Sequence, residues 1–104
     1  MDVVTSTVGA EVWITVTGRI DVLETSALTE QIDDQLAKPV ARLVLDLAGV
    51  EYLDSAGLAV LVRSWRHQQQ HEREFAVVMP SSDAARRIFD LAGFDAVFET
   101  TNPS

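Results

Sequence analysis

One serine in this sequence stands in a setting suited to phosphate chemistry. The segment Leu53-Asp54-Ser55-Ala56-Gly57-Leu58 follows one apolar run, residues 43–47, and opens a second. An Asp-Ser pair at this point is an N-cap signal for a helix, and either Asp54 or Ser55 can be the cap. Because a helix N-terminus presents free backbone N–H groups and the positive end of the helix dipole, it favours a phosphate on Ser55.

The two apolar runs predict the elements that position Ser55. Residues 43–47 are apolar on both faces apart from Asp46, which is typical of a strand covered on both sides in a parallel or mixed sheet. A short acidic loop is expected over residues 48–53, and from Ser55 onward the period becomes that of an amphipathic helix. Its apolar face is predicted to hold Leu58, Leu61, Val62 and Trp65, with Arg63, Ser64 and Arg66 on the other side.

The N-terminal segments predict a hairpin followed by a helix. Val3–Val8 and Val12–Thr17 are β-rich and flank Gly9-Ala10, which suits a tight turn, and Trp13 is expected to be partly buried. Asp21-Val22-Leu23-Glu24 has the form of a capping box, which predicts a helix from Asp21 to about Ala37. Its apolar stripe is Leu28, Ile32 and Leu36, and Lys38-Pro39 ends it.

The C-terminal part predicts a strand, a helix and a last short strand. Phe75–Met79 is β-rich and is stopped by Pro80. Ser81 or Ser82 then caps a helix that Gly93 ends. The apolar face of this helix is Ala84, Ala85, Ile88, Phe89 and Ala92, with Arg86 and Arg87 facing outward. Ala96–Glu99 is expected to be a strand and Thr100–Ser104 a frayed tail.

The predicted order is therefore β-β-α-β-α-β-α-β in a single domain over residues 1–104, with its core at about 3–99. This order predicts an α/β fold, a mixed sheet of about five strands with three to four helices outside it. The right-handed crossover rule places the helices of the βαβ units on one face.

The charge of the chain bears on the kind of partner that it can bind. The net charge is −8, which argues against nucleic-acid binding. Residues 1–62 hold ten acids and three bases, a balance of −7, whereas residues 63–104 hold six acids and five bases. The acidic first half indicates either a partner with a basic surface or a solvated face that aids solubility.

No membrane-spanning run, leader or cysteine is present in the sequence, so we expect a cytoplasmic protein with no direct membrane insertion. His67 and His71 have a spacing that can bind a metal on one helix face. The residues between them are glutamines at a polar helix end, so a solvated helix terminus is the better interpretation. No metal and no cofactor are expected.

An enzyme is not indicated. Ser55 lacks the Gly-x-Ser-x-Gly elbow, and the two histidines lie late on one helix, where neither can act as its base. Phosphate-binding and dinucleotide-binding glycine loops are absent. A phospho-aspartate receiver domain is not indicated either, because Asp46 is expected within a strand and the only lysine, Lys38, ends a helix.

Three segments in order resemble the STAS domain family, specifically its anti-sigma factor antagonists. They are Leu43–Leu47 with Leu53–Leu58, Thr17–Asp21, which is similar to the Gly-Glu-Leu-Asp at the end of the family's second strand, and Arg87–Phe94. The resemblance covers about residues 3–99 and implies the STAS fold. Relatives usually add a C-terminal helix after the last strand, and no such helix is expected here.

The resemblance implies a phosphorylation switch at Ser55. The unphosphorylated protein would capture an anti-sigma factor serine kinase and release a sigma factor, phosphorylation would end the complex, and a serine phosphatase would restore it. Ala56 leaves Ser55 as the sole acceptor in the motif. Partner contact is expected from Asp21, Asp54, Ser55, Ala56, Gly57 and Leu58, and the free protein is expected to be a monomer or weak dimer.

The alternative keeps the fold and changes the role. The chain would be a constitutive STAS subunit of a signalling scaffold or lipid-transport complex, with Ser55 as a helix cap only. Asp21 could likewise be a helix cap and nothing more. The sequence neither supports nor excludes a small molecule bound near Asp21 and Ser55.

Overall fold

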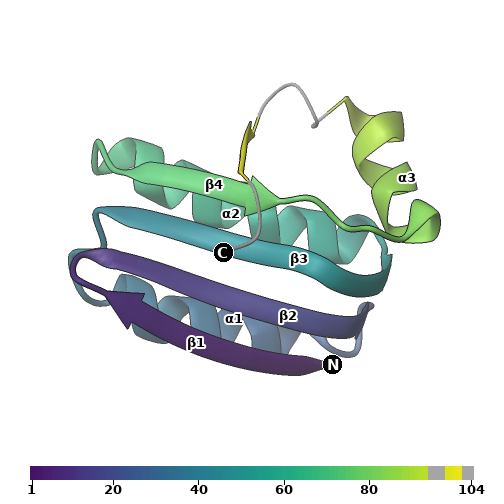
Figure 1. The fold of residues 1–104 in the computed structure, drawn as a ribbon, viewed down its shortest axis with the longest axis horizontal. Helices are drawn as coiled ribbons and strands as arrows, with labels where there is room; N and C mark the ends of the chain where they lie inside the picture. Colours follow the sequence, from purple (N-terminus) through teal and green to yellow (C-terminus); the bar gives the residue numbers. More distant parts are fainter. Residues whose placement is uncertain (94–97, 102–104) are drawn as a thin grey trace.

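The computed structural model describes residues 1–93 and 98–101, and within them the predicted element order is confirmed (Figure 1). The strands are β1 (Asp2–Val8), β2 (Glu11–Ile20), β3 (Arg42–Leu53), β4 (Glu74–Val78) and β5 (Glu99–Thr100). The helices are α1 (Thr25–Leu36), α2 (Ser55–Gln70) and α3 (Asp83–Ala92).

The described strands form one mixed sheet in the order β1-β2-β3-β4-β5. β1 and β2 are antiparallel and are joined through Gly9-Ala10, where Gly9 has a φ of 61°. This positive φ favours glycine, and the predicted hairpin is confirmed. The pairs β2–β3, β3–β4 and β4–β5 are parallel, so the carboxyl ends of these strands meet at one edge of the sheet.

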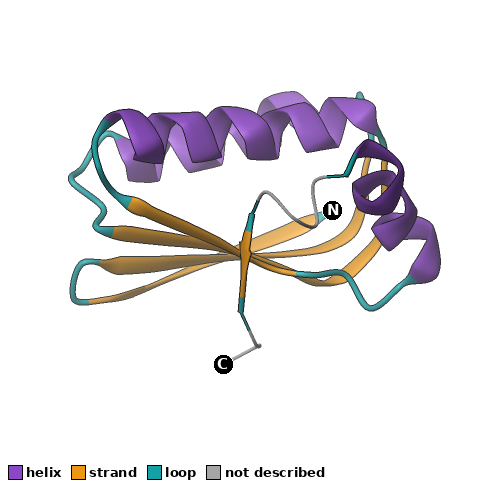
Figure 2. Cartoon of the chain, turned by 90° about the horizontal axis from the view of Figure 1, so that it is seen from above, coloured by secondary structure: helices purple, strands orange, loops and turns teal. Residues whose placement is uncertain are grey.

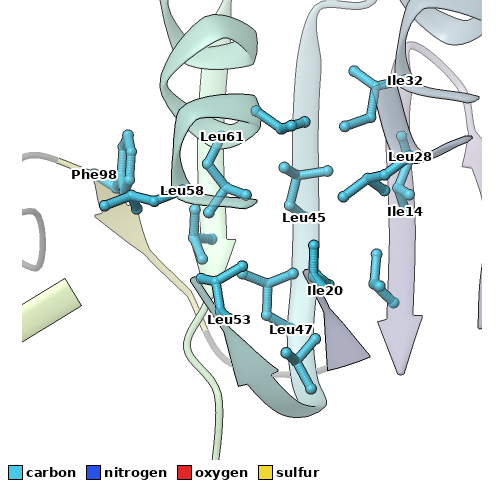
Figure 3. Close-up of a cluster of buried hydrophobic side chains, with 14 of the residues drawn as sticks. Ile14, Ile20, Leu28, Ile32, Leu45, Leu47, Leu53, Leu58, Leu61 and Phe98 are labelled. Atoms are coloured by element: carbon cyan, nitrogen blue, oxygen red, sulfur yellow. The ribbon is translucent and has the colours of Figure 1, made fainter. Parts of the chain in front are cut away.

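The two long helices cover one face of the sheet, as the crossover rule predicts. α1 and α2 lie side by side over it, and α3 lies at one end (Figure 2). The core between the layers is mostly aliphatic, and Phe75, Phe89 and Phe98 are also buried in it. Figure 3 shows Ile14 and Ile20 of β2, Leu45 and Leu47 of β3, Leu28 and Ile32 of α1, and Leu58 and Leu61 of α2 converging there.

The opposite face of the sheet carries a smaller apolar cluster. Val44, Ala76 and Val78 are buried there, with Trp13 and Ala48 packed against them. Trp13 is half-buried, as predicted, and its indole N–H donates to the Glu11 carboxylate over 2.5 Å. The run 43–47 is therefore buried on both faces, although α1 and α2 cover only one of them.

The acidic loop predicted over residues 48–53 is wrong, because β3 continues through it to Leu53. The pairing with β2 shifts register twice in this region. Gly49 faces Thr17 so closely that a Cβ at Gly49 would overlap the Thr17 methyl group. Glycine lowers the strand signal in a sequence, and here it marks a bulge within a long strand.

The prediction of a capping box at Asp21 is also wrong. α1 begins at Thr25, and its N-cap residue, Glu24, makes no side-chain capping bond. Asp21 closes a separate turn before the helix: its carboxylate accepts the Leu23 N–H (3.1 Å) and its carbonyl accepts the Glu24 N–H (2.9 Å). A short acidic side chain can satisfy a turn as readily as a helix N-terminus, so the pattern alone does not separate the two.

The buried face of α2 is rotated from the predicted one. Leu58 and Leu61 are buried as expected, but Val62 and Trp65 are only half-buried. Ser64, predicted to lie on the polar side, is buried, and its hydroxyl donates to the Val60 carbonyl over 2.9 Å. Because this bond satisfies the hydroxyl, the serine can lie against the sheet.

The C-terminal predictions are partly confirmed. Ser82 caps α3, and Gly93 ends it with a φ of 71°. Ala85 and Phe89 are buried and Ile88 is half-buried, whereas the other two residues of the predicted apolar face, Ala84 and Ala92, are exposed; Arg86 and Arg87 face outward as predicted.

The last strand and the tail differ from the prediction. β5 covers Glu99–Thr100, so Thr100 belongs to a strand rather than to a frayed tail. Thr101 continues the contact, since its N–H donates to the Val77 carbonyl over 3.0 Å. The predicted strand residues 96 and 97 and the predicted tail residues 102–104 lie outside the described part.

Gly57 lets the start of α2 approach the ends of β2 and β3. A Cβ at this buried position would overlap Leu53 Cδ1 and lie 3.0 Å from Ile20 Cγ2. We expect Gly57→Ala to lower the free energy of unfolding by about 1–2 kcal/mol, because overpacking outweighs the gain in helix propensity. Urea denaturation measures this change, with the exposed Ser55→Ala as a control. A more stable Gly57→Ala protein would contradict the close fit.

Candidate functional site

Ser55 is the first residue of α2 and lies exposed at its N-terminus. The N-cap is Asp54, whose carboxylate accepts the Gly57 N–H over 3.1 Å and whose carbonyl accepts the Leu58 N–H over 3.0 Å. This answers the question that the sequence left open between Asp54 and Ser55. The N–H groups of Ser55 and Ala56 have no acceptor within the helix, so they remain available beside the serine hydroxyl.

The parallel pairing of β2 and β3 brings the turn after β2 to the start of α2. The Asp54 N–H donates to the Ile20 carbonyl over 3.4 Å, and Asp21 follows Ile20 directly. Asp21 and Ser55, which the resemblance implied as partner-contact residues, thus lie at the same edge of the sheet. Its carboxylate is engaged in the turn with the Leu23 N–H.

The six predicted partner-binding residues do not all lie at the surface. Ser55 is exposed, and Asp21, Asp54 and Ala56 are half-buried. Gly57 is buried, and Leu58 is only 6% exposed because it packs into the core. In the free protein these last two residues support the site from below rather than forming its surface.

Two hollows border α2. One of about 710 Å³ has Ser55 at one end and is lined further along the helix by Val62, Arg66 and His67. The other, about 570 Å³, lies between α1 and α2. Its lining includes Ala56 and Ala59 of α2 and the acidic Glu30, Asp33 and Asp34 of α1.

The α1–α2 groove, the hollow of about 570 Å³, has only carboxylates among its charged lining residues, whereas the hollow at Ser55 is lined by Arg63 and Arg66 as well as by Asp33. Arg63 of α2 binds Asp33 of α1 through two hydrogen bonds of 2.9 and 3.0 Å, which raises the pKa of the guanidinium. Glu30 and Asp34 form no ion pair with the residues that the structure describes. A partner that covers this face must therefore meet carboxylates.

The histidine pair shows no sign of a metal site. No group of three or more candidate ligands occurs in the described residues. His71 Nδ1 lies 2.8 Å from the His67 carbonyl, and the two rings are 4.4 Å apart. Burial, followed by the charges of His71 and Arg73, lowers the pKa of His67. A neutral imidazole packed beside its neighbour fits a helix end.

The sequence did not predict the exposure of Val22 and Leu23 or the burial of Gln68. Val22 and Leu23 were assigned to a helix cap, but they are among the most exposed large apolar side chains that the structure describes. Gln68 was assigned to a polar helix end, but it is fully buried. For Val22 and Leu23 the sequence offers one weak signal: they are adjacent apolar residues directly after Asp21 and lie outside the apolar stripe of α1. For Gln68 it offers none.

Asp54 tests the local geometry by itself. We expect Asp54→Ala to lower the free energy of unfolding by about 1 kcal/mol, since the Gly57 N–H loses its acceptor. Asp54→Asn keeps an oxygen in the same place and should lose less. Urea denaturation of both variants separates the cap from the charge, and equal losses would contradict the capping role.

The sheet order and the exposed serine at the start of α2 define a STAS-type α/β protein, and comparison with known proteins agrees. A family model described as "Mlab, STAS domain" matches residues 3–99. The crystal structure of an anti-sigma factor antagonist from Mycobacterium paratuberculosis superposes with a TM-score of 0.86 at 30% identity, covering 99% of this chain and 86% of that one.

Two curated relatives narrow the class. The anti-sigma-F factor antagonist RsfB of Mycobacterium tuberculosis is 36% identical over 85 residues, which are 82% of this chain and 68% of that protein. The anti-sigma-B factor antagonist of Listeria monocytogenes is 32% identical over 89 residues, covering 86% and 77%. The chain belongs to the STAS domain family, among the anti-sigma factor antagonists.

These antagonists are regulatory proteins and not enzymes, in agreement with the sequence. None of the helices in the described part of the chain is long and apolar enough to cross a bilayer.

Proposed function

We propose that the unphosphorylated chain binds an anti-sigma factor that is also a serine kinase, and thereby frees a sigma factor. Phosphorylation of Ser55 by that kinase then ends the complex, and a serine phosphatase restores the free form. The observation that carries the proposal is the exposed Ser55 at the N-terminus of α2 in a chain of the anti-sigma factor antagonist family.

The helix terminus makes the phosphorylated chain stable by itself. A phosphate adds about −1.5 to −2 charges at neutral pH. The unpaired N–H groups of Ser55 and Ala56 and the helix dipole offset part of this charge. No change of fold is required, so the switch can act on binding alone.

The same charge is unfavourable against a partner. Asp54 and Asp21 already place carboxylates at this edge, and the α1–α2 groove adds Glu30 and Asp34. A partner that packs closely against this edge must desolvate the added phosphate and accept its bulk. A loss of about 3–4 kcal/mol corresponds to several hundredfold in affinity, which is enough for an on/off switch.

The proposal places the protein in the cytoplasm as a monomer or weak dimer, with Asp21, Asp54, Ser55 and Ala56 at the partner surface and Gly57 and Leu58 beneath it. A permanent dimer that buried this edge would not leave Ser55 open to a kinase.

Affinity capture from native cells tests the proposal. Wild type, Ser55→Ala and Ser55→Asp serve as parallel baits, with mass spectrometry of bait and prey. We expect an anti-sigma factor with kinase activity on wild type and Ser55→Ala but not on Ser55→Asp, and phosphate on Ser55 of wild type. If all three baits capture the same scaffold or lipid-transport proteins and Ser55 carries no phosphate, the chain is a constitutive STAS subunit instead.

A further inference from the structure

The turn after β2 presents two adjacent apolar side chains to solvent. Val22 is 67% exposed and Leu23 is 85% exposed. Neither belongs to the core, so neither contributes to the stability of the free chain through burial. Scattered exposed apolar residues are ordinary on a protein surface, but two neighbours at the apex of one turn form a small projecting patch.

This turn is held in place by hydrogen bonds although the side chains at its apex are largely exposed. The Asp21 carboxylate accepts the Leu23 N–H over 3.1 Å, and the Asp21 carbonyl accepts the Glu24 N–H over 2.9 Å. The Thr25 hydroxyl donates to the Val22 carbonyl over 3.0 Å. Three hydrogen bonds within five residues fix the backbone before any partner arrives, which reduces the entropy lost on binding.

The turn also lies next to the start of α2, where Ser55 is exposed. Ile20, which precedes it, accepts the Asp54 N–H through its carbonyl and packs against Gly57. The turn therefore begins at Asp21, directly after the residue that is hydrogen-bonded to Asp54, the N-cap of α2. A partner that covers Ser55 extends over this turn if its interface has even a modest size.

Carboxylates frame the apolar pair. Asp21 and Glu24 flank it in sequence, and Asp54 lies across the Ile20 contact. The nearest cation in sequence, Arg19, is stacked over the Tyr52 ring with 4.4 Å between the guanidinium carbon and the ring centroid. Two apolar side chains with carboxylates around them are complementary to an apolar pocket with basic side chains around it.

We propose that Val22 and Leu23 form a preorganised apolar anchor that inserts into an apolar pocket, rimmed by lysine or arginine, on the anti-sigma factor. This inference rests on the proposed function and adds to it the main apolar contact. The anchor gives affinity, and Ser55 beside it decides whether that affinity is used.

The test compares two double variants of equal chemistry. Val22→Ser/Leu23→Ser removes the anchor, and Val8→Ser/Leu91→Ser removes a valine and a leucine that are 72% and 74% exposed on the β1–β2 hairpin and on α3. Binding is measured by calorimetry against the purified anti-sigma factor that the capture experiment identifies. Urea denaturation should show that both variants keep the stability of wild type.

We expect the anchor variant to raise Kd about 10- to 100-fold, as the loss of two buried aliphatic side chains implies, and the control pair to change it less than about twofold. The slope of affinity against salt should stay that of wild type, since no charge has changed.

The failures are distinguishable. If wild type binds, Ser55→Asp does not, and the anchor variant binds like wild type, the anchor is overturned and the switch stands. If wild type itself does not bind an anti-sigma factor, the proposed function fails and the anchor fails with it.

Discussion

Ser55→Asp is expected to weaken binding to the anti-sigma factor by more than about 100-fold. The substituted carboxylate stands beside Asp54, at an edge that Asp21 and the α1 carboxylates already make negative. In the free chain the helix N-terminus accepts this charge, and in the complex the charge must be desolvated. Calorimetric titration of the purified anti-sigma factor measures the loss.

Two variants separate the position of the charge from its presence. Ser55→Ala keeps the neutral surface, so it should bind like wild type and resist release by kinase and ATP. Gln69→Glu adds one charge to the exposed far end of the same helix, about 21 Å along its axis, and should leave the affinity within about twofold. Equal weakening by Ser55→Asp and Gln69→Glu would show a general charge effect and contradict a local switch.

Gln68→Ala is expected to cause the largest loss of stability, about 2–4 kcal/mol in the free energy of unfolding. The Gln68 amide is fully buried, and its nitrogen donates to the carbonyl of Val40 over 3.0 Å and to that of Glu74 over 2.9 Å. It joins the end of α2 to Val40, shortly before β3, and to Glu74, the first residue of β4. Truncation leaves both carbonyls without this donor and opens a cavity.

Gln69→Ala is the matched control, because the side chain beside Gln68 is exposed. It should change the free energy of unfolding by less than about 0.5 kcal/mol. Urea denaturation of both variants provides the comparison. Equal and small losses would mean that water or neighbouring groups replace the amide without cost.

Periodicity predicted the elements of this fold well but not every face. The apolar runs at residues 43–47 and 75–79 and the helix stripe at Leu28 and Ile32 determined the strand and helix order, because burial imposes these periods on a sequence. Periodicity did not predict the burial of Ser64 and Gln68. Hydrophobicity does not report that the Ser64 hydroxyl is satisfied by the Val60 carbonyl one turn back in its own helix, or that the fold brings the Val40 and Glu74 carbonyls to the Gln68 amide.

Local signals were ambiguous at the two ends that form the site. At Ser55 the cap signal was correct, and the structure assigned the cap to Asp54. At Asp21 the same chemistry closed a turn instead, because the preceding strand and the α2 contact at Ile20 fix where the chain must go. The exposure of Val22 and Leu23 follows from that difference, so the sequence could not predict it.

The most direct test of the switch follows phosphate and complex in one sample. Purified chain is mixed with the purified anti-sigma factor and ATP, Ser55 occupancy is read by mass spectrometry of the intact protein and its peptides, and the complex is followed by size-exclusion chromatography with light scattering. The account predicts that the complex disappears in proportion to phosphate on Ser55 and that Ser55→Ala keeps the complex intact. A complex that persists with Ser55 fully phosphorylated would contradict it.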